Sequence, residues 1–144
     1  MLLIDGLKFE LADFSKSATA KRKGIDNTLK GDDILDYQYL LDIIIKIQAK
    51  FGKPIYINSG FRSEELNKAV GGATKSQHRS LKEEAAADIT AGNRTLNKEL
   101  YALIRQMVNS NEIVLDQVID EKALTWIHIS VKRNGVNREQ FFKL

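Results

Sequence analysis

The chain has 144 residues, of which 43% are hydrophobic and 28% are charged, with 22 basic against 19 acidic side chains. This size and composition predict a globular chain that needs no disulfide or metal merely to fold. Cysteine is absent, which excludes a disulfide scaffold, a thiolate metal site and a thiol nucleophile. The formal net charge of +3 is small and the basic residues are scattered, so no nucleic-acid partner is expected.

No membrane insertion is expected, because apolar runs such as residues 43–45 are far shorter than the roughly 20 residues that cross a bilayer. The N-terminus reaches Asp5 without a basic region, so we expect no signal peptide. Pro54 is the only proline, and neither a repeat nor a low-complexity linker interrupts the chain. We therefore expect one domain over residues 1–144, in which residues 1–31 form an N-terminal arm packed on the body.

The first long element is a predicted helix that ends near Lys50, before Gly52. Asp32 or Asp33 is expected to cap it, because a short carboxylate accepts hydrogen bonds from the first backbone N–H groups. A wide apolar stripe that includes Tyr37 predicts that most of this helix is buried.

The remaining predicted elements follow from apolar spacing and from the glycines that interrupt it. In chain order they are a strand at 55–58, a helix capped by Ser63 and ended by Gly71, a strand at 87–90, a helix at 97–110 and a hairpin of strands at 113–119 and 126–131. Helices flanking a small, mainly antiparallel sheet predict an α+β domain.

The two histidines are candidates for a metal site, because no sulfur ligand is present to replace them. Alternation along the last strand places Trp126, His128 and Ser130 on one face, opposite an aliphatic face. His78 follows a glycine loop in an equally polar setting, and Asp88 interrupts an apolar strand. Two histidines and a carboxylate form the ligand set of catalytic zinc hydrolases, although the residues alone leave a structural role open for each.

Four short motifs make the sequence more specific. They are residues 59–63 (Ser-Gly-Phe-Arg-Ser), residues 65–72 (Glu-Leu-Asn-Lys-Ala-Val-Gly-Gly), residues 76–78 (Ser-Gln-His) and residues 126–130 (Trp-Ile-His-Ile-Ser). Together they resemble the zinc D-Ala-D-Ala carboxypeptidase family, which includes phage L-alanyl-D-glutamate endolysins and shares its fold with the Hedgehog signalling domain. Residues 14–20, 24–28, 116–119 and 137–141 resemble the phage-like branch of that family, so the resemblance covers nearly the whole chain.

The resemblance implies a Hedgehog/DD-peptidase-like fold and one zinc ion. The implied metal ligands are His78, Asp88 and His128. Arg62 matches the family's substrate-gripping arginine, whose guanidinium clamps a carboxylate or stabilises an oxyanion. Ser76 and Gln77 match positions beside the first histidine and are expected to contact substrate.

One departure from the family concerns the spacing of the ligands. Nine residues lie between His78 and Asp88, where the family usually has fewer. A longer loop still returns Asp88 to the metal, because ligand geometry constrains only its ends. Glu84 is the rival ligand; Asp88 is preferred because Asp88 and Ile89 keep the family's strand register.

A second departure concerns the catalytic acid/base, since many family members carry an acid three residues before the last histidine. This chain has Thr125 there, which cannot transfer the proton. If the hairpin turn spans 122–125, Glu121 faces Trp126 and shares the face of His128, within reach of the site. Asp120 then points to the opposite face, and a register slip of one residue would exchange the two acids.

We therefore expect a monomeric zinc metallopeptidase that acts on peptidoglycan stem peptides, with Glu121 and Arg62 as catalytic residues. The expected reaction is either removal of a terminal D-Ala or cleavage of the L-Ala–D-Glu bond. The compact chain resembles a phage or prophage endolysin, made in the cytoplasm and acting on the cell wall. The alternatives are an inactive peptidoglycan-binding module or phage structural component with the same fold, and a domain that uses zinc only for stability.

Overall fold

The computed structural model describes residues 10–72, 78 and 83–144. The helical elements are η1 (Leu11–Ser15, a 3-10 helix), α1 (Ala18–Lys23), α2 (Asp32–Phe51), α3 (Glu64–Ala69) and α4 (Arg94–Asn109). The strands are β1 (Tyr56–Ser59), β2 (Glu84–Thr90), β3 (Gln117–Glu121), β4 (Trp126–Lys132) and β5 (Gln140–Lys143). Among the described residues, no helix combines the length and hydropathy needed to cross a membrane.

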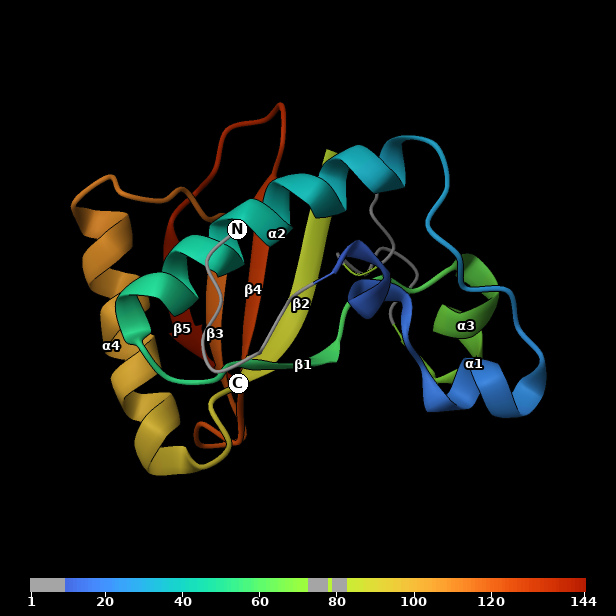
Figure 1. The fold of residues 1–144 in the computed structure, drawn as a ribbon, viewed down its shortest axis with the longest axis horizontal. Helices are drawn as coiled ribbons and strands as arrows, with labels where there is room; N and C mark the ends of the chain where they lie inside the picture. The colour runs from blue at the N-terminus through green and yellow to red at the C-terminus, as the bar shows by residue number, and fades with distance from the viewer. Residues whose placement is uncertain (1–9, 73–77, 79–82) are drawn as a thin grey trace.

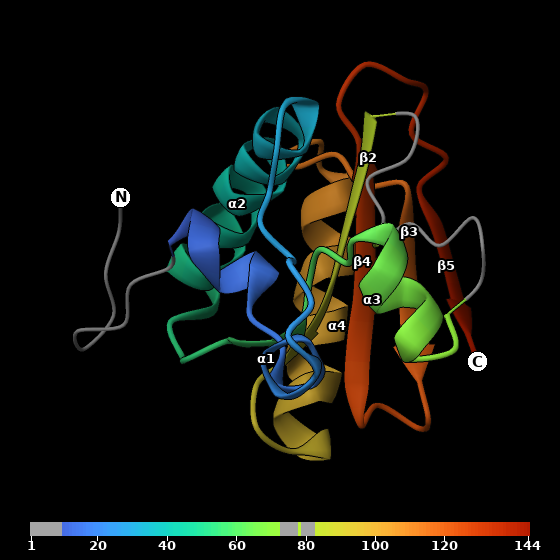
Figure 2. The ribbon, with the colours of Figure 1, turned by 90° about the vertical axis from the view of Figure 1, so that its right-hand side faces the viewer.

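The strands form one open sheet in the order β1-β2-β4-β3-β5. Neighbouring strands are antiparallel except β3 and β5, which are parallel. Helices α2 and α4 lie on the same side of this sheet, while α1 and α3 lie against each other beyond β1 and β2 (Figures 1 and 2). The predicted α+β architecture with a mainly antiparallel sheet is confirmed.

One face of the sheet packs into the hydrophobic core. On β4 the inward residues Ile127, Ile129 and Val131 join a buried cluster with residues of α2 and α4. Because side chains alternate along a strand, His128 and Ser130 lie on the other face. The core therefore fixes which face of the sheet presents polar groups, as the sequence pattern predicts.

The start of α2 differs from the prediction. Its N-cap residue is Gly31, without a side-chain cap hydrogen bond, so the expected capping by Asp32 or Asp33 is wrong. The Asp33 carboxylate instead accepts a hydrogen bond from the Lys30 N–H at 3.3 Å. Both acids remain in the first turn, where the partial positive charge of the helix N-terminus favours them.

Other boundaries also differ from the prediction: β2 begins at Glu84 rather than at residue 87, and α4 begins at Arg94, after the capping Asn93, rather than at residue 97. β3 begins at Gln117, later than expected, because Ile113 and Leu115 are buried from a loop rather than from a strand. Alternation predicts which side chains are buried, and it does not require a hydrogen-bonded ladder. β5 was not expected; in this short strand the partly buried Phe141 packs against the core.

Candidate metal centre

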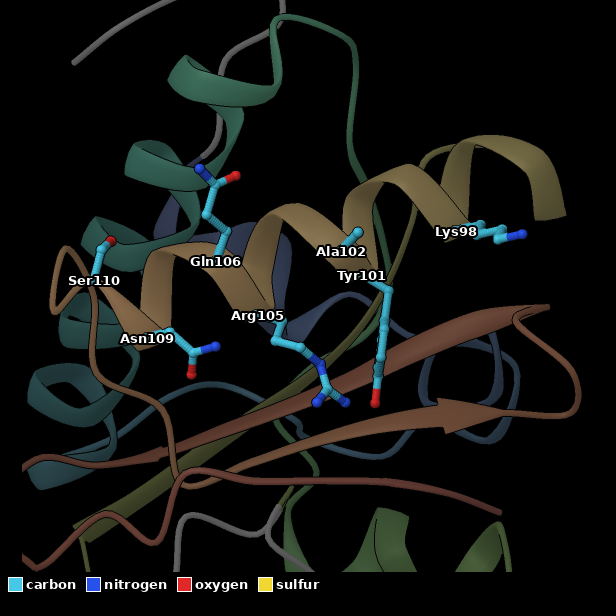
Figure 3. Close-up of a pocket in the computed structure, with 7 residues that line it drawn as sticks. All are labelled: Lys98, Tyr101, Ala102, Arg105, Gln106, Asn109 and Ser110. Carbon is cyan, nitrogen blue, oxygen red and sulfur yellow. The ribbon is translucent and has the colours of Figure 1, made fainter.

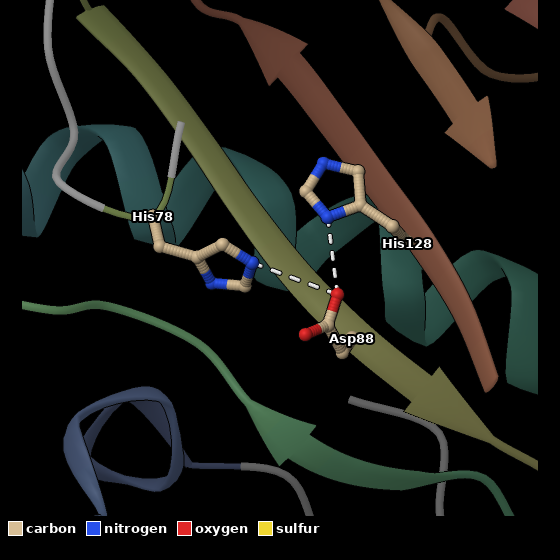
Figure 4. A group of neighbouring side chains, drawn as sticks. All are labelled: His78, Asp88 and His128. Atoms are coloured by element: carbon tan, nitrogen blue, oxygen red, sulfur yellow. Dashed lines mark hydrogen bonds and ion pairs between the residues drawn. The ribbon is translucent and has the colours of Figure 1, made fainter. Parts of the chain in front are cut away.

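Three side chains that could share a metal ion meet on the polar face of the sheet (Figure 4). They are His78, Asp88 and His128, and one ligand atom from each lies within 4.8 Å of the others. Asp88 Oδ1 lies 3.0 Å from His128 Nδ1 and 3.5 Å from His78 Nε2. These two separations bracket the roughly 3.4 Å between ligand atoms of a tetrahedral zinc site.

Sheet pairing brings two of the three side chains together. Asp88 on β2 lies directly opposite His128 on β4. Opposite residues of an antiparallel pair point to the same face, with Cβ atoms about 5 Å apart. Neighbours of Asp88 and His128 along both strands point into the core, so neither side chain can turn inward without displacing a buried apolar residue. The pairing of β2 with β4 thus holds the Asp88 and His128 side chains next to each other on the polar face.

His78 reaches the pair from the segment before β2, and its ring is oriented by Gly60. The His78 Nδ1 atom lies 2.5 Å from the Gly60 carbonyl oxygen. Since a carbonyl oxygen only accepts hydrogen bonds, Nδ1 donates to Gly60 and Nε2 is the ring nitrogen that faces Asp88. This hydrogen bond orients the ring so that a metal can be bound through Nε2.

Position 60 has no room for a side chain. A Cβ atom at this position would lie 2.6 Å from the Phe14 carbonyl oxygen and 2.8 Å from its Cα atom. The next residue, Phe61, donates its N–H to the same Phe14 oxygen at 2.8 Å. Gly60 lies in the Ser-Gly-Phe-Arg-Ser motif that carries the family resemblance, but the motif alone indicates neither of these two roles.

The charge of Asp88 suits a metal ligand. Burial alone would raise the pKa of its carboxyl, but hydrogen bonds and positive charge from His128 and His78 hold that pKa well below its usual range. The carboxylate is therefore ionised at neutral pH and available as a ligand. His78 and His128 are 4% and 8% exposed, so the three donors form a largely buried site whose donor set fits zinc.

The rival carboxylate does not join this group. Glu84 opens β2 opposite Lys132, four residues before Asp88. That spacing corresponds to about 13 Å along a strand, beyond the reach of a shared ion. Among the described residues, the assembled donors therefore include Asp88 rather than Glu84.

Arg62 is attached to the same region through its backbone. Its N–H donates to the His78 carbonyl oxygen at 2.7 Å, and the side chain is half-buried. Burial lowers the pKa of the guanidinium while the negative charge of Asp88 acts in the opposite direction, and Arg62 remains a cation. A Cβ atom at position 72 would collide with the Asn67 side chain and lie 3.4 Å from Arg62 Nη2, so Gly72 leaves room for both.

A cavity of about 230 Å³ adjoins Arg62. Its lining includes Lys16 and Thr19 from the N-terminal segment and Ser59 from the end of β1. Ser59 is the strand partner of Asp88, so this cavity borders the metal centre. Polar and cationic groups thus converge on a concave surface beside the three donors.

The hairpin has the register predicted from the sequence. Glu121 pairs with Trp126, and it shares its face with His128. Asp120 pairs with Ile127 on the opposite face, where its Oδ1 accepts the Leu124 N–H at 2.7 Å. Glu121 is therefore the acid of this hairpin on the metal-binding face, and Asp120 holds the turn.

Two predicted substrate contacts, Ser76 and Gln77, lie outside the described residues. A different, larger hollow of about 690 Å³ lies along the outer side of α4, beside Tyr101 and Arg105 (Figure 3). Since α4 covers the core face of the sheet, this hollow is on the side opposite His128. It is not part of the metal centre.

Asp88 and His128 on adjacent strands, with His78 from the segment before β2, form the ligand set that is typical of zinc hydrolases. Comparison with protein families supplies the narrower identification: the model of Peptidase M15 matches residues 7–130, which include all three donors. The chain therefore belongs to the Peptidase M15 family and is a zinc metallopeptidase. A search of curated proteins gave no match.

Proposed function

We propose that the chain hydrolyses peptide bonds in peptidoglycan stem peptides at a zinc ion held by His78, Asp88 and His128. The observation that carries this proposal is the convergence of the three donor atoms within 4.8 Å in a chain of the Peptidase M15 family. When bound, zinc supplies a water of lowered pKa and a Lewis acid for the scissile carbonyl.

Glu121 is the proposed general base. It lies diagonally across the hairpin from His128, and diagonal neighbours are about 7–8 Å apart at Cα. A glutamate side chain spans much of that distance and places its carboxylate over the metal-binding face. Glu121 then takes a proton from the attacking water and returns it to the departing amine. Glu121 would thus provide the proton transfer that Thr125, at the family's usual acid position, cannot perform.

Arg62 is the proposed anchor for a substrate carboxylate. Its guanidinium is half-buried beside a concave surface, where bidentate hydrogen bonding to a carboxylate is stronger than in bulk water. Stem peptides carry free carboxylates and D-amino acids, which favours them over ordinary proteins as substrates. Two bonds fit this chemistry, a terminal D-Ala-D-Ala bond and the internal L-Ala–D-Glu bond cut by endolysins of the cell wall.

Mass spectrometry of purified peptidoglycan fragments tests the proposal. Fragments are incubated with the protein, with and without a zinc chelator, and the products are weighed. Loss of one alanine identifies a carboxypeptidase, whereas a divided stem identifies an endopeptidase with an endolysin role. Arg62→Lys is expected to raise KM more than it lowers kcat, because an ammonium cannot make the bidentate contact.

The alternative is a peptidoglycan-binding relative without catalysis. The sequence feature that favours it is Thr125 at the family's usual acid position. It predicts that the zinc-loaded, folded protein binds the fragments and releases no product from any wall chemistry. A chelator-sensitive product contradicts it.

A further inference from the structure

We propose that Tyr37 is a positioning residue of the metal centre. Its buried hydroxyl connects the backbone at His78 to strand β2 at Ala86, two residues before Asp88. The hydroxyl thereby sets the distance between two of the three donors. This inference rests on the proposal that His78, Asp88 and His128 hold the metal.

The ring of Tyr37 has a fixed place in the core. It projects from α2, is fully buried, and packs between Phe14 and Phe61 at centroid distances of 5.0 and 5.8 Å. Phe14 and Phe61 are themselves joined by a backbone hydrogen bond, and Phe61 follows Gly60, whose carbonyl orients the His78 ring. These ring contacts therefore fix the position of the Tyr37 hydroxyl.

The Tyr37 hydroxyl bonds a part of the β2 edge that β1 does not cover. The described pairing of β1 with β2 ends at Ser59 and Asp88, so Ala86, two residues before Asp88, has no partner on β1. Tyr37 Oη accepts the Ala86 N–H at 3.3 Å and lies 3.0 Å from the Ala86 carbonyl oxygen. One side chain thus satisfies both backbone groups of a buried residue at an open strand edge.

The same hydroxyl reaches the first histidine. Tyr37 Oη lies 3.2 Å from the His78 carbonyl oxygen, which also accepts the Arg62 N–H at 2.7 Å. A tyrosine has one hydroxyl proton, so the carbonyls of Ala86 and His78 share it. The backbone of His78 is then held from α2 and from Arg62, while its ring is held by Gly60.

These contacts act on the metal centre rather than on packing alone. Phenylalanine would fill the same volume, so the apolar core does not explain the hydroxyl. Burying a hydroxyl is favourable only where its hydrogen bonds are made, and all three contacts go to backbone atoms at or near metal ligands. Groups that orient metal ligands typically change metal affinity by about 10–100-fold when they are removed.

The test compares the zinc affinity of Tyr37→Phe with that of the wild type, measured by competition with a chromophoric chelator. Tyr39→Phe is the matched control, because Tyr39 lies on the same helix and is 37% exposed. Tyr37→Phe is expected to raise the Kd for zinc by about 10–100-fold, and Tyr39→Phe to leave it within about twofold. Cobalt-substituted protein is expected to show an altered d–d absorption spectrum only in Tyr37→Phe.

A Tyr37→Phe protein that is less stable in its apo form but binds zinc as the wild type does would overturn the inference. A wild-type chain that binds no zinc would overturn the proposed metal centre itself, which is a distinguishable failure. Hydrogen exchange of the wild type gives a second measurement that does not depend on the variant's folding. Zinc is expected to slow exchange of the Ala86 N–H by about tenfold or more, and an unchanged rate contradicts the inference.

Discussion

The carboxylate of Asp116 and the guanidinium of Arg138 form a two-point ion pair, with Nη2 to Oδ2 at 2.7 Å and Nε to Oδ1 at 3.0 Å. The Arg138 N–H adds a third bond to Oδ1 at 2.9 Å. Asp116 has no exposed side-chain surface and directly precedes β3, whereas Arg138 precedes β5. The pair therefore fastens the start of the parallel strand β5 to the rest of the sheet.

This pair predicts acid sensitivity. Burial alone would raise the pKa of the Asp116 carboxyl, but hydrogen bonds from the side chain and backbone of Arg138, with nearby positive charge, hold it below its usual value. Because the folded-state pKa is depressed, the stabilisation is present above the unfolded-state pKa of about 3.9 and is lost as pH falls through the folded-state value. Asp116→Asn is expected to lower the unfolding free energy at pH 7 by about 2 kcal/mol, with a smaller deficit below about pH 4.

Urea denaturation of both proteins between neutral and acid pH measures this difference. Glu139→Gln is a suitable control, because Glu139 is an exposed acid in the same segment. A deficit in Asp116→Asn that does not shrink toward acid pH would contradict the role given to the ion pair.

Asp88→Asn is expected to weaken zinc binding by at least about 100-fold, because the neutral amide removes both a ligand charge and a strong donor. Glu84→Gln tests the competing assignment with an equivalent chemical change on the same strand. It should retain the zinc content of the wild type, as measured by elemental analysis after dialysis. Loss of zinc in Glu84→Gln with retention in Asp88→Asn would reverse the assignment.

Glu121→Gln is expected to reduce kcat by about 10²–10⁴-fold while zinc content and folding are unchanged. Asp120→Asn is the control: it removes the neighbouring negative charge, yet its amide oxygen can still accept the Leu124 N–H in the turn. Rates of product release from peptidoglycan fragments distinguish the two variants. A larger loss of kcat in Asp120→Asn would show that the base had been assigned to the wrong face of the hairpin.

The hairpin turn beside Glu121 is strained. Lys122, Ala123 and Leu124 have φ angles of 47°, 55° and 61°, a left-handed region that disfavours side chains with a Cβ atom. Ala123→Gly is expected to raise the unfolding free energy by about 1 kcal/mol, because glycine adopts this conformation without steric cost.

The same substitution elsewhere should have the opposite effect. Ala102→Gly, at an exposed position inside α4, is expected to lower stability by about 1 kcal/mol, because glycine is unfavourable within a helix. Thermal and urea unfolding of the two variants check the signs. Destabilisation by Ala123→Gly would contradict the strain described for the turn.

Parts of the metal centre follow from local rules, whereas the full ligand set of His78, Asp88 and His128 is implied by the family resemblance. Strand alternation places His128 on the polar face, and the length of the hairpin turn sets Glu121 opposite Trp126. Because the chain has no cysteine, no thiolate donor is available, which limits the kinds of metal ion that the site can bind. These features require only neighbouring residues, and the structure has the expected faces and pairing.

Other features depend on contacts between segments far apart in the chain. The pattern of α2 identifies Tyr37 as a core residue, but only the tertiary structure brings its hydroxyl to His78 and Ala86. Strand β5 is short and pairs in parallel with β3, so its sequence carries little periodic signal. The predicted cap of α2 is wrong because Asp32 and Asp33 are residues of a type that commonly caps helices, whereas the cap is the preceding Gly31 in a positive-φ conformation.

Anomalous diffraction from a zinc-loaded crystal, recorded on both sides of the zinc absorption edge, shows whether His78, Asp88 and His128 bind one zinc ion. We expect one strong peak within about 2.0–2.2 Å of His78 Nε2, His128 Nδ1 and an Asp88 carboxylate oxygen. A peak bound by other side chains, or no peak at these three in a fully loaded crystal, would contradict this assignment.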